Sequence, residues 1–388
     1  MTSTRRDWFL FTALTFCFSF GFAVYTGIFQ NFLRDVLRAG PAQLGTLESL
    51  REVPGLLTAF LAGTLVALAE SRLAAVALAL CAGGIAATGS ATGFWPLVAI
   101  TVAWSIGAHL WLAVSPAITL SLAGGREGGR HLGRMTGVGA VAVLSALALT
   151  RLAKEYLAYD ALFRLAGVFI LIAALLAAMI RHRAPGGRRL RLVYRPEYRL
   201  YYLLTFLEGC RRQIFATFAS FVLIVVYHQD VRTMLTLAFV NACLTAVAGP
   251  CAGRLIDRLG ERPTLLAYYA LLIFVFAGYA LVSSVPVLYA LYLIDNVLFT
   301  CGAALTVYLH RLARPGDMTP SLAMGTTMNH IAAVTVPVTG GLLWKQYGNY
   351  QIPFWIGVGV LLISIAAARR LPAGSPARPV EPGEPAAV

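Results

Sequence analysis

The sequence carries very little charge for its length. Only 12% of its 388 residues are Asp, Glu, Lys or Arg, and 59% are hydrophobic. A soluble domain has roughly 25% charged residues, most of them on its surface. A chain with so few charges cannot cover the surface of a soluble fold of this size, so the composition excludes a soluble globular protein.

Motifs for redox, metal and nucleotide chemistry are also missing. The six cysteines lie within or at the ends of apolar runs, and none belongs to a C-x-x-C pair or a Cys/His ligand pattern. We therefore predict no disulfide framework, no metal site and no cofactor. The absence of a Walker A loop excludes ATP drive within this chain. The absence of H-E-x-x-H and G-x-S-x-G motifs argues against an intramembrane enzyme.

The chain contains instead a series of long apolar runs. Each has about 20 residues or more, the length that crosses roughly 30 Å of hydrocarbon as a helix. Their continuity favours helices over the short alternating strands of a barrel. The first run is too long for a signal peptide, so we expect a retained span. Twelve spans are predicted, at 8–33, 44–69, 72–90, 94–122, 133–151, 158–180, 198–227, 231–255, 264–283, 286–310, 321–344 and 350–369.

One connection differs from the other short loops. Residues 181–199, between the sixth and seventh runs, hold seven Arg together with Pro and two Gly. We interpret this segment as a basic cytoplasmic linker between two six-helix bundles, 1–180 and 200–370. The Pro-rich residues 371–388 predict a disordered cytoplasmic tail.

The net charge of +14 does not indicate a nucleic-acid partner. The basic residues lie in short loops between apolar runs, where the positive-inside rule places them. With the N-terminus in the cytoplasm, Lys and Arg on the cytoplasmic side outnumber those on the other side by about three to one. We therefore expect an integral protein of the bacterial cytoplasmic (inner) membrane, with both termini cytoplasmic and the lipid bilayer as its partner.

Two segments indicate an internal repeat. GTLVALAESR begins at Gly63 and GRLIDRLGER begins at Gly253, an offset of 190 residues. The same offset maps Trp8, at the start of the first run, onto Tyr198, at the start of the seventh. The halves are therefore predicted to be parallel, pseudo-symmetric repeats, related by an axis along the membrane normal. The predicted fold class is an all-α polytopic membrane protein with 12 transmembrane helices.

A loop motif lies in the second copy of this repeat. Gly253, Asp257, Arg258, Gly260 and Arg262 follow the pattern G-x-x-x-D-[RK]-x-G-x-[RK]-[RK], whose last position is not basic here. Together with the twelve spans and the basic central loop, this motif resembles the major facilitator superfamily over nearly the whole chain. The first copy of the motif is degraded.

The resemblance implies that helices 1, 4, 7 and 10 line a central cavity and that the two halves rock around it. The loop has an independent physical interpretation. Gly253 allows close helix contact, and Asp257 and Arg258 can pair with neighbouring charges or helix ends. We therefore expect Gly253, Asp257, Arg258, Gly260 and Arg262 to control the conformation. A solvated turn that follows the positive-inside rule is the alternative.

On this resemblance we expect a secondary active transporter that moves a small solute, for which an anion is one candidate, by alternating access. We expect proton coupling and a monomer. A uniporter, or an exporter of drugs or metabolites, is the nearest alternative, although the fifth run lacks the Pro of the Gly/Pro-rich motif common in antiporters of this superfamily. A receptor without transport and an intramembrane enzyme are more distant alternatives.

Ionisable residues inside the predicted spans indicate where the solute binds. A charge at the bilayer centre costs roughly 3 kcal/mol on insertion scales, so such residues face a cavity or a partner. Helix 7 carries Glu208, Arg211 and Arg212 near the midplane, and helix 10 places Asp295 and Asn296 at similar depth. We predict that Arg211 or Arg212 binds the solute with Asn296, and that Glu208 or Asp295 exchanges a proton. A structural ion-pair network that only ties helices 7 and 10 together is the alternative.

Other spans contribute weaker candidates for the same layer. His109 on helix 4, with Asn329 and His330 on helix 11, is predicted near the midplane, and Tyr25 lies on helix 1. We expect all four to contact the solute, although each histidine also fits a hydrogen-bonded core position. Arg51 and Glu52, predicted in the outer third of helix 2, form a candidate extracellular gate or a local ion pair.

Overall fold

The computed structural model describes residues 3–65, 70–123, 128–181, 194–314 and 317–372. The described residues form α-helices and three short 3₁₀ turns, without a β-strand. The helices are α1 (Ser3–Asp35), α2 (Pro41–Leu65), α3 (Glu70–Ala87), α4 (Phe94–Ala123), α5 (Gly128–Ala153), α6 (Tyr159–Met179), α7 (Arg199–Val225), α8 (Val231–Leu259), α9 (Glu261–Leu281), α10 (Val285–Phe299), α11 (Ala303–Leu312), α12 (Met318–Tyr347) and α13 (Gln351–Ala368).

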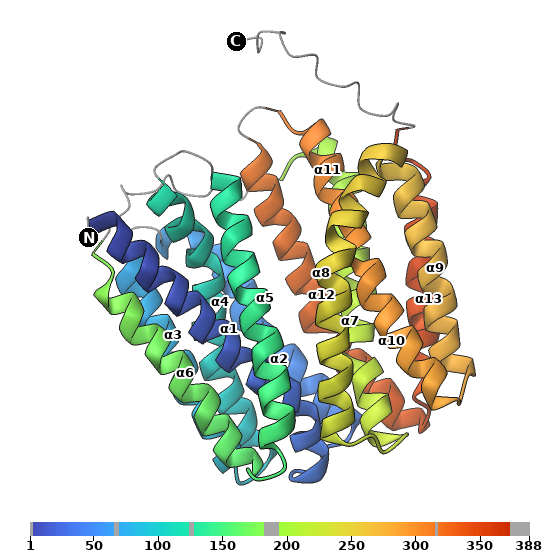
Figure 1. The fold of residues 1–388 in the computed structure, drawn as a ribbon. Helices are drawn as coiled ribbons and strands as arrows, with labels where there is room; N and C mark the ends of the chain where they lie inside the picture. The colour runs from blue at the N-terminus through green and yellow to red at the C-terminus, as the bar shows by residue number, and fades with distance from the viewer. Residues whose placement is uncertain (1–2, 66–69, 124–127, 182–193, 315–316, 373–388) are drawn as a thin grey trace.

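The helices form two bundles that stand side by side (Figure 1). Helices α1–α6 lie on one side and α7–α13 on the other, and the start of α1 lies at the same end of the molecule as the end of α13. The 3₁₀ turn η3 (Thr300–Gly302) joins α10 to α11, so these two helices make one interrupted span. The prediction of twelve spans is confirmed, and most predicted boundaries fall within a few residues of the helix ends. The interruption at η3 was not predicted.

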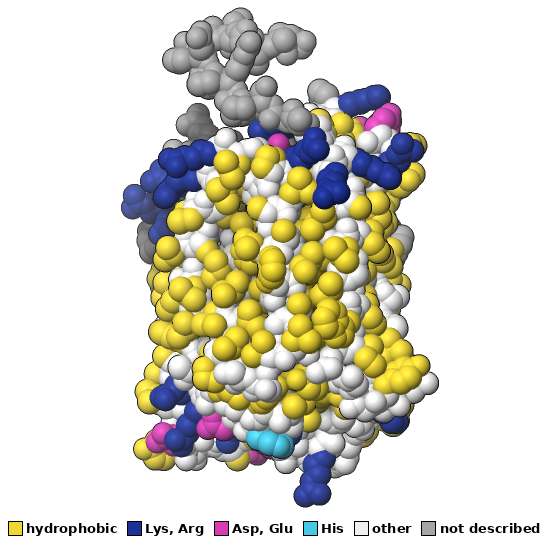
Figure 2. All heavy atoms as spheres, turned by 90° about the vertical axis from the view of Figure 1, so that its right-hand side faces the viewer, with side chains coloured by type: hydrophobic (Ala, Val, Ile, Leu, Met, Phe, Trp, Pro, Cys, Tyr) yellow, Lys and Arg dark blue, Asp and Glu magenta, His cyan; other side chains and the backbone are white. Residues whose placement is uncertain are grey.

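An apolar belt covers the middle of the face shown in Figure 2. Charged side chains gather at the two ends of this face, with a concentration of Lys and Arg at the end where α1 begins and α13 ends. In the described part of the chain, nine helical segments are long and apolar enough to cross a membrane. The protein is therefore an integral membrane protein, and the belt faces the lipid.

The three remaining spans, α2, α7 and α12, carry charged or polar residues in their central turns. Charged residues interrupt α2 and α7, and α12 carries Asn329 and His330 near its centre. Helix α12 packs along both α2 and α7. Because a charged group in hydrocarbon is costly, the charged side chains on these helices are expected to pair with partners on neighbouring helices rather than face lipid.

The two bundles approach most closely where α2 meets α12. A Cβ atom built at Gly45 would lie 2.1 Å from the carbonyl oxygen of Pro337, and one built at Gly341 would lie 2.4 Å from the carbonyl oxygen of Pro41. Real Cβ atoms do not approach a carbonyl oxygen this closely, so glycine is required at both positions. The two helices are therefore in backbone contact, as small residues permit between membrane helices.

Further contacts between the bundles lie near the same end, remote from the termini. Arg34 at the end of α1 donates to the carbonyl oxygens of Ile224, at 2.8 Å, and Gln229, at 3.0 Å. Glu155, just beyond α5, pairs with Arg232 at the start of α8 across 3.1 Å. These contacts hold the bundles together at one end of the molecule.

Two predicted connecting segments fall partly within the described residues. Most of the predicted linker, residues 182–193, lies outside the described residues, but its last part is packed: Tyr198 is buried and donates to the carboxylate of Asp317 across 3.0 Å. Leu371, the first residue of the predicted tail, is buried. The remainder of the tail, 373–388, lies outside the described residues.

Candidate functional site

A polar cavity of about 230 Å³ lies between the two bundles. Helices α1 and α2 form one wall, and α7, α8 and α10 form the other. Its polar side chains are mostly amides, hydroxyls and phenols, which donate and accept hydrogen bonds without net charge. The polar residues that line it are Tyr25, Thr26, Gln30, Asn31, Glu48, Arg51, Gln213, Thr217, Ser220 and Tyr292.

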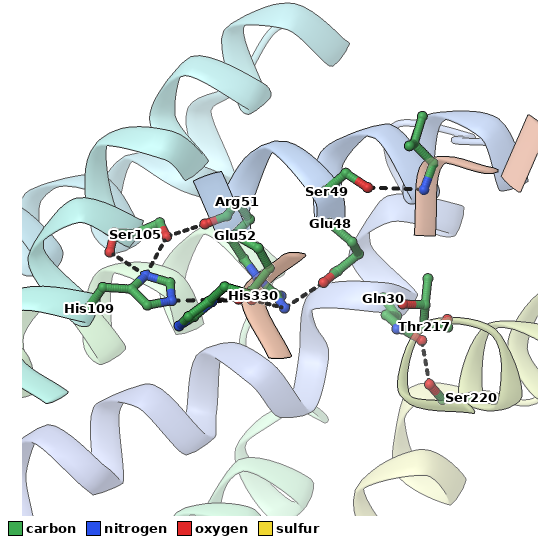
Figure 3. A network of polar contacts seen from close by, with 11 residues as sticks. Gln30, Glu48, Ser49, Arg51, Glu52, Ser105, His109, Thr217, Ser220 and His330 are labelled. Atoms are coloured by element: carbon green, nitrogen blue, oxygen red, sulfur yellow. Dashed lines mark hydrogen bonds and ion pairs between the residues drawn. The ribbon is translucent and has the colours of Figure 1, made fainter. Parts of the chain in front are cut away.

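Hydrogen bonds between the bundles cross this cavity (Figure 3). Ser220 on α7 donates to the side-chain oxygen of Gln30 on α1 across 2.7 Å, and the amide of Gln30 donates to the carbonyl oxygen of Thr217 across 3.5 Å. Outside the cavity lining, Ser49 on α2 accepts from the backbone N–H of Val338 on α12 across 3.0 Å. A solute that fills the cavity can therefore compete for groups that now join the halves.

One cation and two carboxylates lie on consecutive turns of α2. Arg51 is 2.6 Å from the carboxylate of Glu48 and 3.2 Å from that of Glu52. Glu48 and Arg51 line the cavity, whereas the second carboxylate oxygen of Glu52 points to two histidines. The charges of Glu48 and Arg51, which line the cavity, therefore cancel each other. Glu52 adds one negative charge, which faces the two histidines.

Glu52, His109 and His330 meet at one point between α2, α4 and α12 (Figure 3). Oε2 of Glu52 lies 3.2 Å from Nδ1 of His330 and 3.6 Å from Nε2 of His109. The two imidazole rings are 5.3 Å apart between centroids. The structure thus brings together two predicted solute contacts and a predicted gate residue. It corrects the depth predicted for Glu52, which lies near the middle of α2 rather than in its outer third.

Two small residues shape this cluster. A Cβ atom at Gly55 would lie 2.4 Å from Cε1 of His330 and 2.5 Å from Nε2 of His109, so only glycine leaves room for both rings. Ser105, one turn before His109, places its carbonyl oxygen and its hydroxyl 3.0 Å from Nδ1 of that ring. The hydroxyl of Ser105 donates to the carbonyl oxygen of Arg51 across 2.5 Å. The orientation of His109 is therefore fixed from both sides.

A second ionic cluster surrounds Arg211, whose side chain is completely buried. Its Nε donates to Glu208 across 3.0 Å and its Nη1 to Asp295 across 3.3 Å. Tyr268 on α9 donates to Glu208 across 2.8 Å and also bonds to Arg211. Arg211 therefore ties α7, α9 and α10 together and does not line the cavity. This is the geometry of the predicted structural ion-pair network.

Arg212 has different surroundings although it follows directly in the sequence. Its side chain is exposed, and its guanidinium lies 4.6 Å from the centroid of the Phe299 ring. Glu52 in the other bundle lies within its electrostatic range. Of the two arginines, Arg212 is the one that faces the space between the bundles.

The two predicted asparagines bond to their own helices. Asn296 donates to the carbonyl oxygen of Tyr292 across 2.8 Å, and Asn329 donates to that of Gly325 across 3.4 Å. Asn329 also packs closely against Gly209 of α7. Neither asparagine lines the cavity. Of the residues predicted to bind the solute, Tyr25 is the one that does.

The loop motif lies between α8 and α9. Gly260 has φ 82° and ψ 170°, a conformation that other residues rarely adopt, so the glycine of the motif is required by the turn. The expectation that Gly253 permits close helix contact is not met, since a Cβ atom there would meet nothing within 4 Å. Asp257 and Arg258 are exposed and Arg262 is half-buried, and none of the three forms an ion pair within the described part of the chain.

The loop is held instead by Glu261, which lies at a variable position of the motif between Gly260 and Arg262. Glu261 at the start of α9 is buried and pairs with Arg311 near the end of α11 across 2.7 Å. The sequence interpretation missed this pair, because the carboxylate does not belong to the motif pattern.

The residues on the α7 wall of the cavity were also missed. Gln213, Thr217 and Ser220 carry no charge, so the presence of ionisable residues in a span does not indicate them. Their spacing of four and three residues is nevertheless a signal, since it places them on one face of a helix. A polar stripe inside an apolar run is the pattern that predicts a cavity-lining face.

The comparisons with known proteins agree with this architecture. The family model of the Major Facilitator Superfamily matches residues 11–319 and 200–387. No curated protein sequence matches the chain.

Solved transporter structures show the same fold. The nucleoside transporter NupG is 14% identical with a TM-score of 0.74, and the match covers 96% of this chain and 99% of NupG. A bacterial homologue of the iron transporter ferroportin, in an inward-facing state, is 14% identical with a TM-score of 0.75, covering 95% and 98%. The D-xylose-proton symporter is 13% identical with a TM-score of 0.71, covering 94% and 96%. At these identities the likeness is one of fold alone.

Proposed function

The chain belongs to the major facilitator superfamily of transporters, and we propose that it moves a small, hydroxyl-rich solute across the bacterial cytoplasmic membrane by proton-coupled alternating access. The cavity between the bundles is the observation on which this proposal depends. Both bundles contribute side chains to it, so a solute bound there contacts both moving parts at once. This is the arrangement that alternating access around a fixed site requires.

The lining of the cavity supports an uncharged polar solute. Gln30, Gln213, Thr217 and Ser220 offer both donors and acceptors, and Tyr25 and Tyr292 offer aromatic faces. The one cation in the lining, Arg51, is neutralised by Glu48. An anionic solute would need an unbalanced cation, and Arg212 is the remaining candidate for that role. The nucleoside and D-xylose carriers with this fold also transport polar solutes rich in hydroxyl groups.

Proton coupling is proposed at Asp295. Its carboxylate accepts from Arg211 at 3.3 and 3.5 Å, whereas Glu208 accepts at 3.0 Å from the same guanidinium and also from Tyr268. Asp295 therefore makes longer hydrogen bonds to Arg211 than Glu208 does. Protonating Asp295 breaks the link between α10 and α7, and it costs less free energy than protonating Glu208. The link between α7 and α10 would loosen and re-form as the proton binds and leaves.

The orientation follows from the distribution of basic residues. The end of the molecule where α1 begins and α13 ends is rich in Lys and Arg (Figure 2). The positive-inside rule assigns such an end to the cytoplasm. The contacts between the bundles at the opposite end would then close the extracellular side, and the structure would represent an inward-facing state.

Flux measurements in proteoliposomes test this proposal. Purified protein is screened with labelled sugars and nucleosides, with and without an inward proton gradient. We expect uptake of at least one such solute, stimulated by the gradient, and strongly reduced by Gln213→Ala and Thr217→Val. Thr335→Val on the exposed face of α12 is the matched control and should transport normally.

Other outcomes identify the alternatives. Uptake that ignores the proton gradient would indicate a uniporter. Binding without flux would indicate a receptor, and would overturn the proposed function. Extrusion against the gradient from everted vesicles would indicate an exporter.

A further inference from the structure

Three side chains of types that can bind metal ions lie together at the boundary between the bundles. Glu52, His109 and His330 each present one ligand atom, and these atoms all lie within 4.8 Å of one another. They come from α2, α4 and α12, and none of them lines the polar cavity. The group is therefore separate from the proposed solute site.

The hydrogen bonding of His109 indicates that a cation belongs in this group. The carbonyl oxygen of Ser105 accepts only, so the Nδ1 of His109 must carry a hydrogen to bond with it at 3.0 Å. In neutral His109, Nε2 is then a bare acceptor, and it faces the carboxylate of Glu52 at 3.6 Å. Two acceptors that face each other repel unless a cation lies between them.

The geometry suits a transition-metal ion in that position. Tetrahedral zinc binds His nitrogen and carboxylate oxygen at about 2.0–2.2 Å, which keeps neighbouring ligand atoms roughly 3.3 Å apart. The separations from Oε2 of Glu52 are 3.2 Å to His330 and 3.6 Å to His109. Two imidazoles and one carboxylate are a donor set that suits first-row divalent ions.

The residues around this group orient the histidines in the way that is usual for metal ligands. A metal-binding histidine generally donates its other ring N–H to a carbonyl or carboxylate, which fixes the tautomer and the ring orientation. His109 makes this bond to Ser105. Gly55 leaves space for both rings, and the side chains of the three ligands are only 14–17% exposed.

We propose that Glu52, His109 and His330 bind a divalent transition-metal ion, such as Zn²⁺, between the two bundles. Glu52 and His109 belong to the first bundle and His330 to the second, so the ion bridges them. The nearby charges are compatible: Arg51 is shared by Glu48 and Glu52, so these three residues keep one net negative charge, and Oε2 of Glu52 faces the metal position. Arg212, within electrostatic range, opposes the ion and sets an upper limit on the affinity.

Binding would stabilise the conformation described here, because separating α2 from α12 removes one of three ligands. This consequence rests on the proposed alternating access, whereas the metal site itself does not. We therefore expect saturating Zn²⁺ to slow transport, and metal binding to persist even if no flux is found.

The test uses the full-length protein in detergent after treatment with a chelator. Calorimetric titration with Zn²⁺ should show one ion bound per chain, and Co²⁺ should give visible absorption bands of a bound ion. Glu52→Gln, His109→Gln and His330→Gln should each weaken Zn²⁺ binding at least tenfold, since even the loss of supporting hydrogen bonds costs about 10–100-fold. His228→Gln and His310→Gln, at exposed histidines, are the controls and should bind normally.

A second measurement uses the unaltered protein, so it does not depend on the folding of any variant. Zn²⁺ should protect His109 and His330, but not His310, from modification by diethyl pyrocarbonate, as read by mass spectrometry. Absence of Zn²⁺ binding in the wild type, or binding that survives all three ligand variants, would overturn the proposal. In that case a proton is the cation that joins His109 to Glu52.

Discussion

Arg211 on α7 donates to the carboxylate of Asp295 on α10 across 3.3 Å, in a site where the arginine is fully buried. The same guanidinium bonds to Glu208 on its own helix. Two carboxylates thus share one cation, and Tyr268 from α9 completes the group. The second bundle is held together at its centre by charge as well as by apolar packing.

Removing the cation should damage the fold. Arg211→Ala leaves Glu208 and Asp295 buried without their partner, and breaking a buried ion pair in this way costs about 3–5 kcal/mol. We expect the variant to melt well below the wild type in a thermal unfolding assay, or to fail to accumulate in the membrane.

Two variants test whether the stability lost in Arg211→Ala is due to the unpaired carboxylates. Arg212→Ala, at the exposed neighbour, should fold with nearly wild-type stability. The triple variant Glu208→Gln, Arg211→Met, Asp295→Asn removes all the charges together and should recover much of the lost stability. A triple variant as unstable as Arg211→Ala would show that the ion pairs are not the cause.

The charged residues of the site could be found from the sequence, but their roles could not. Arg211 and Arg212 differ by a rotation of about 100° around the helix. That rotation sends one side chain into the bundle and the other toward the space between the bundles. Hydropathy counts place both at the same depth, and only the packing of α9 and α10 decides which is enclosed.

The histidine cluster shows a second limit of sequence reasoning. Glu52, His109 and His330 come from three helices far apart in the chain, so no local spacing pattern reveals them. Span boundaries were predicted well, because the length of a membrane helix is set by the bilayer. The break at η3 was missed, since the residues Thr300–Gly302 carry no Pro or charge to mark it.

The glycine contacts between α2 and α12 should control how tightly the bundles close. Gly45→Ala or Gly341→Ala places a methyl group against a backbone carbonyl oxygen of the other helix, and overpacking of this kind costs about 1–3 kcal/mol. We expect these variants to favour the state in which α2 and α12 are apart. A cysteine placed at Ser49, which now bonds to α12, should react faster with a soluble maleimide.

The control for this experiment is Gly137→Ala in the cysteine background. A methyl group at that position meets nothing within 4 Å, so the labelling rate should not change. Equal labelling rates in all the glycine variants would show that the α2–α12 contact does not limit access to Ser49.

The contact between Asp317, Arg195 and Tyr198 should be insensitive to pH near neutrality. Partial desolvation acts to raise the pKa of Asp317, but hydrogen bonds from Arg195 and Tyr198 hold that pKa below its ordinary value. A lowered folded-state pKa stabilises the protein above the unfolded value of about 3.9, and this stabilisation is lost as the pH falls through the folded value. The difference in melting temperature between the wild type and Asp317→Asn should therefore be constant from pH 5 to pH 8.

A double-variant comparison checks the assignment of this pH dependence. Arg195→Ala removes the main hydrogen-bond donor, so Asp317→Asn should have less effect in that background. A change between pH 5 and pH 8 in the melting-temperature difference between the wild type and Asp317→Asn would mean that another group titrates in this contact.

Gly260 should be the glycine of the loop motif that the fold requires most. Its φ of 82° and ψ of 170° lie in a region that is open essentially to glycine alone, where other residues cost about 1–3 kcal/mol. Gly260→Ala should therefore lower the melting temperature and disturb the turn that positions Glu261 for its pair with Arg311. Gly348→Asn is the matched control, because φ 62° and ψ 15° form a left-handed helix cap that asparagine tolerates. Equal melting temperatures for the two variants would show that the turn between α8 and α9 accommodates alanine without strain. The role of Gly260 would then lie in the change between conformations rather than in stability.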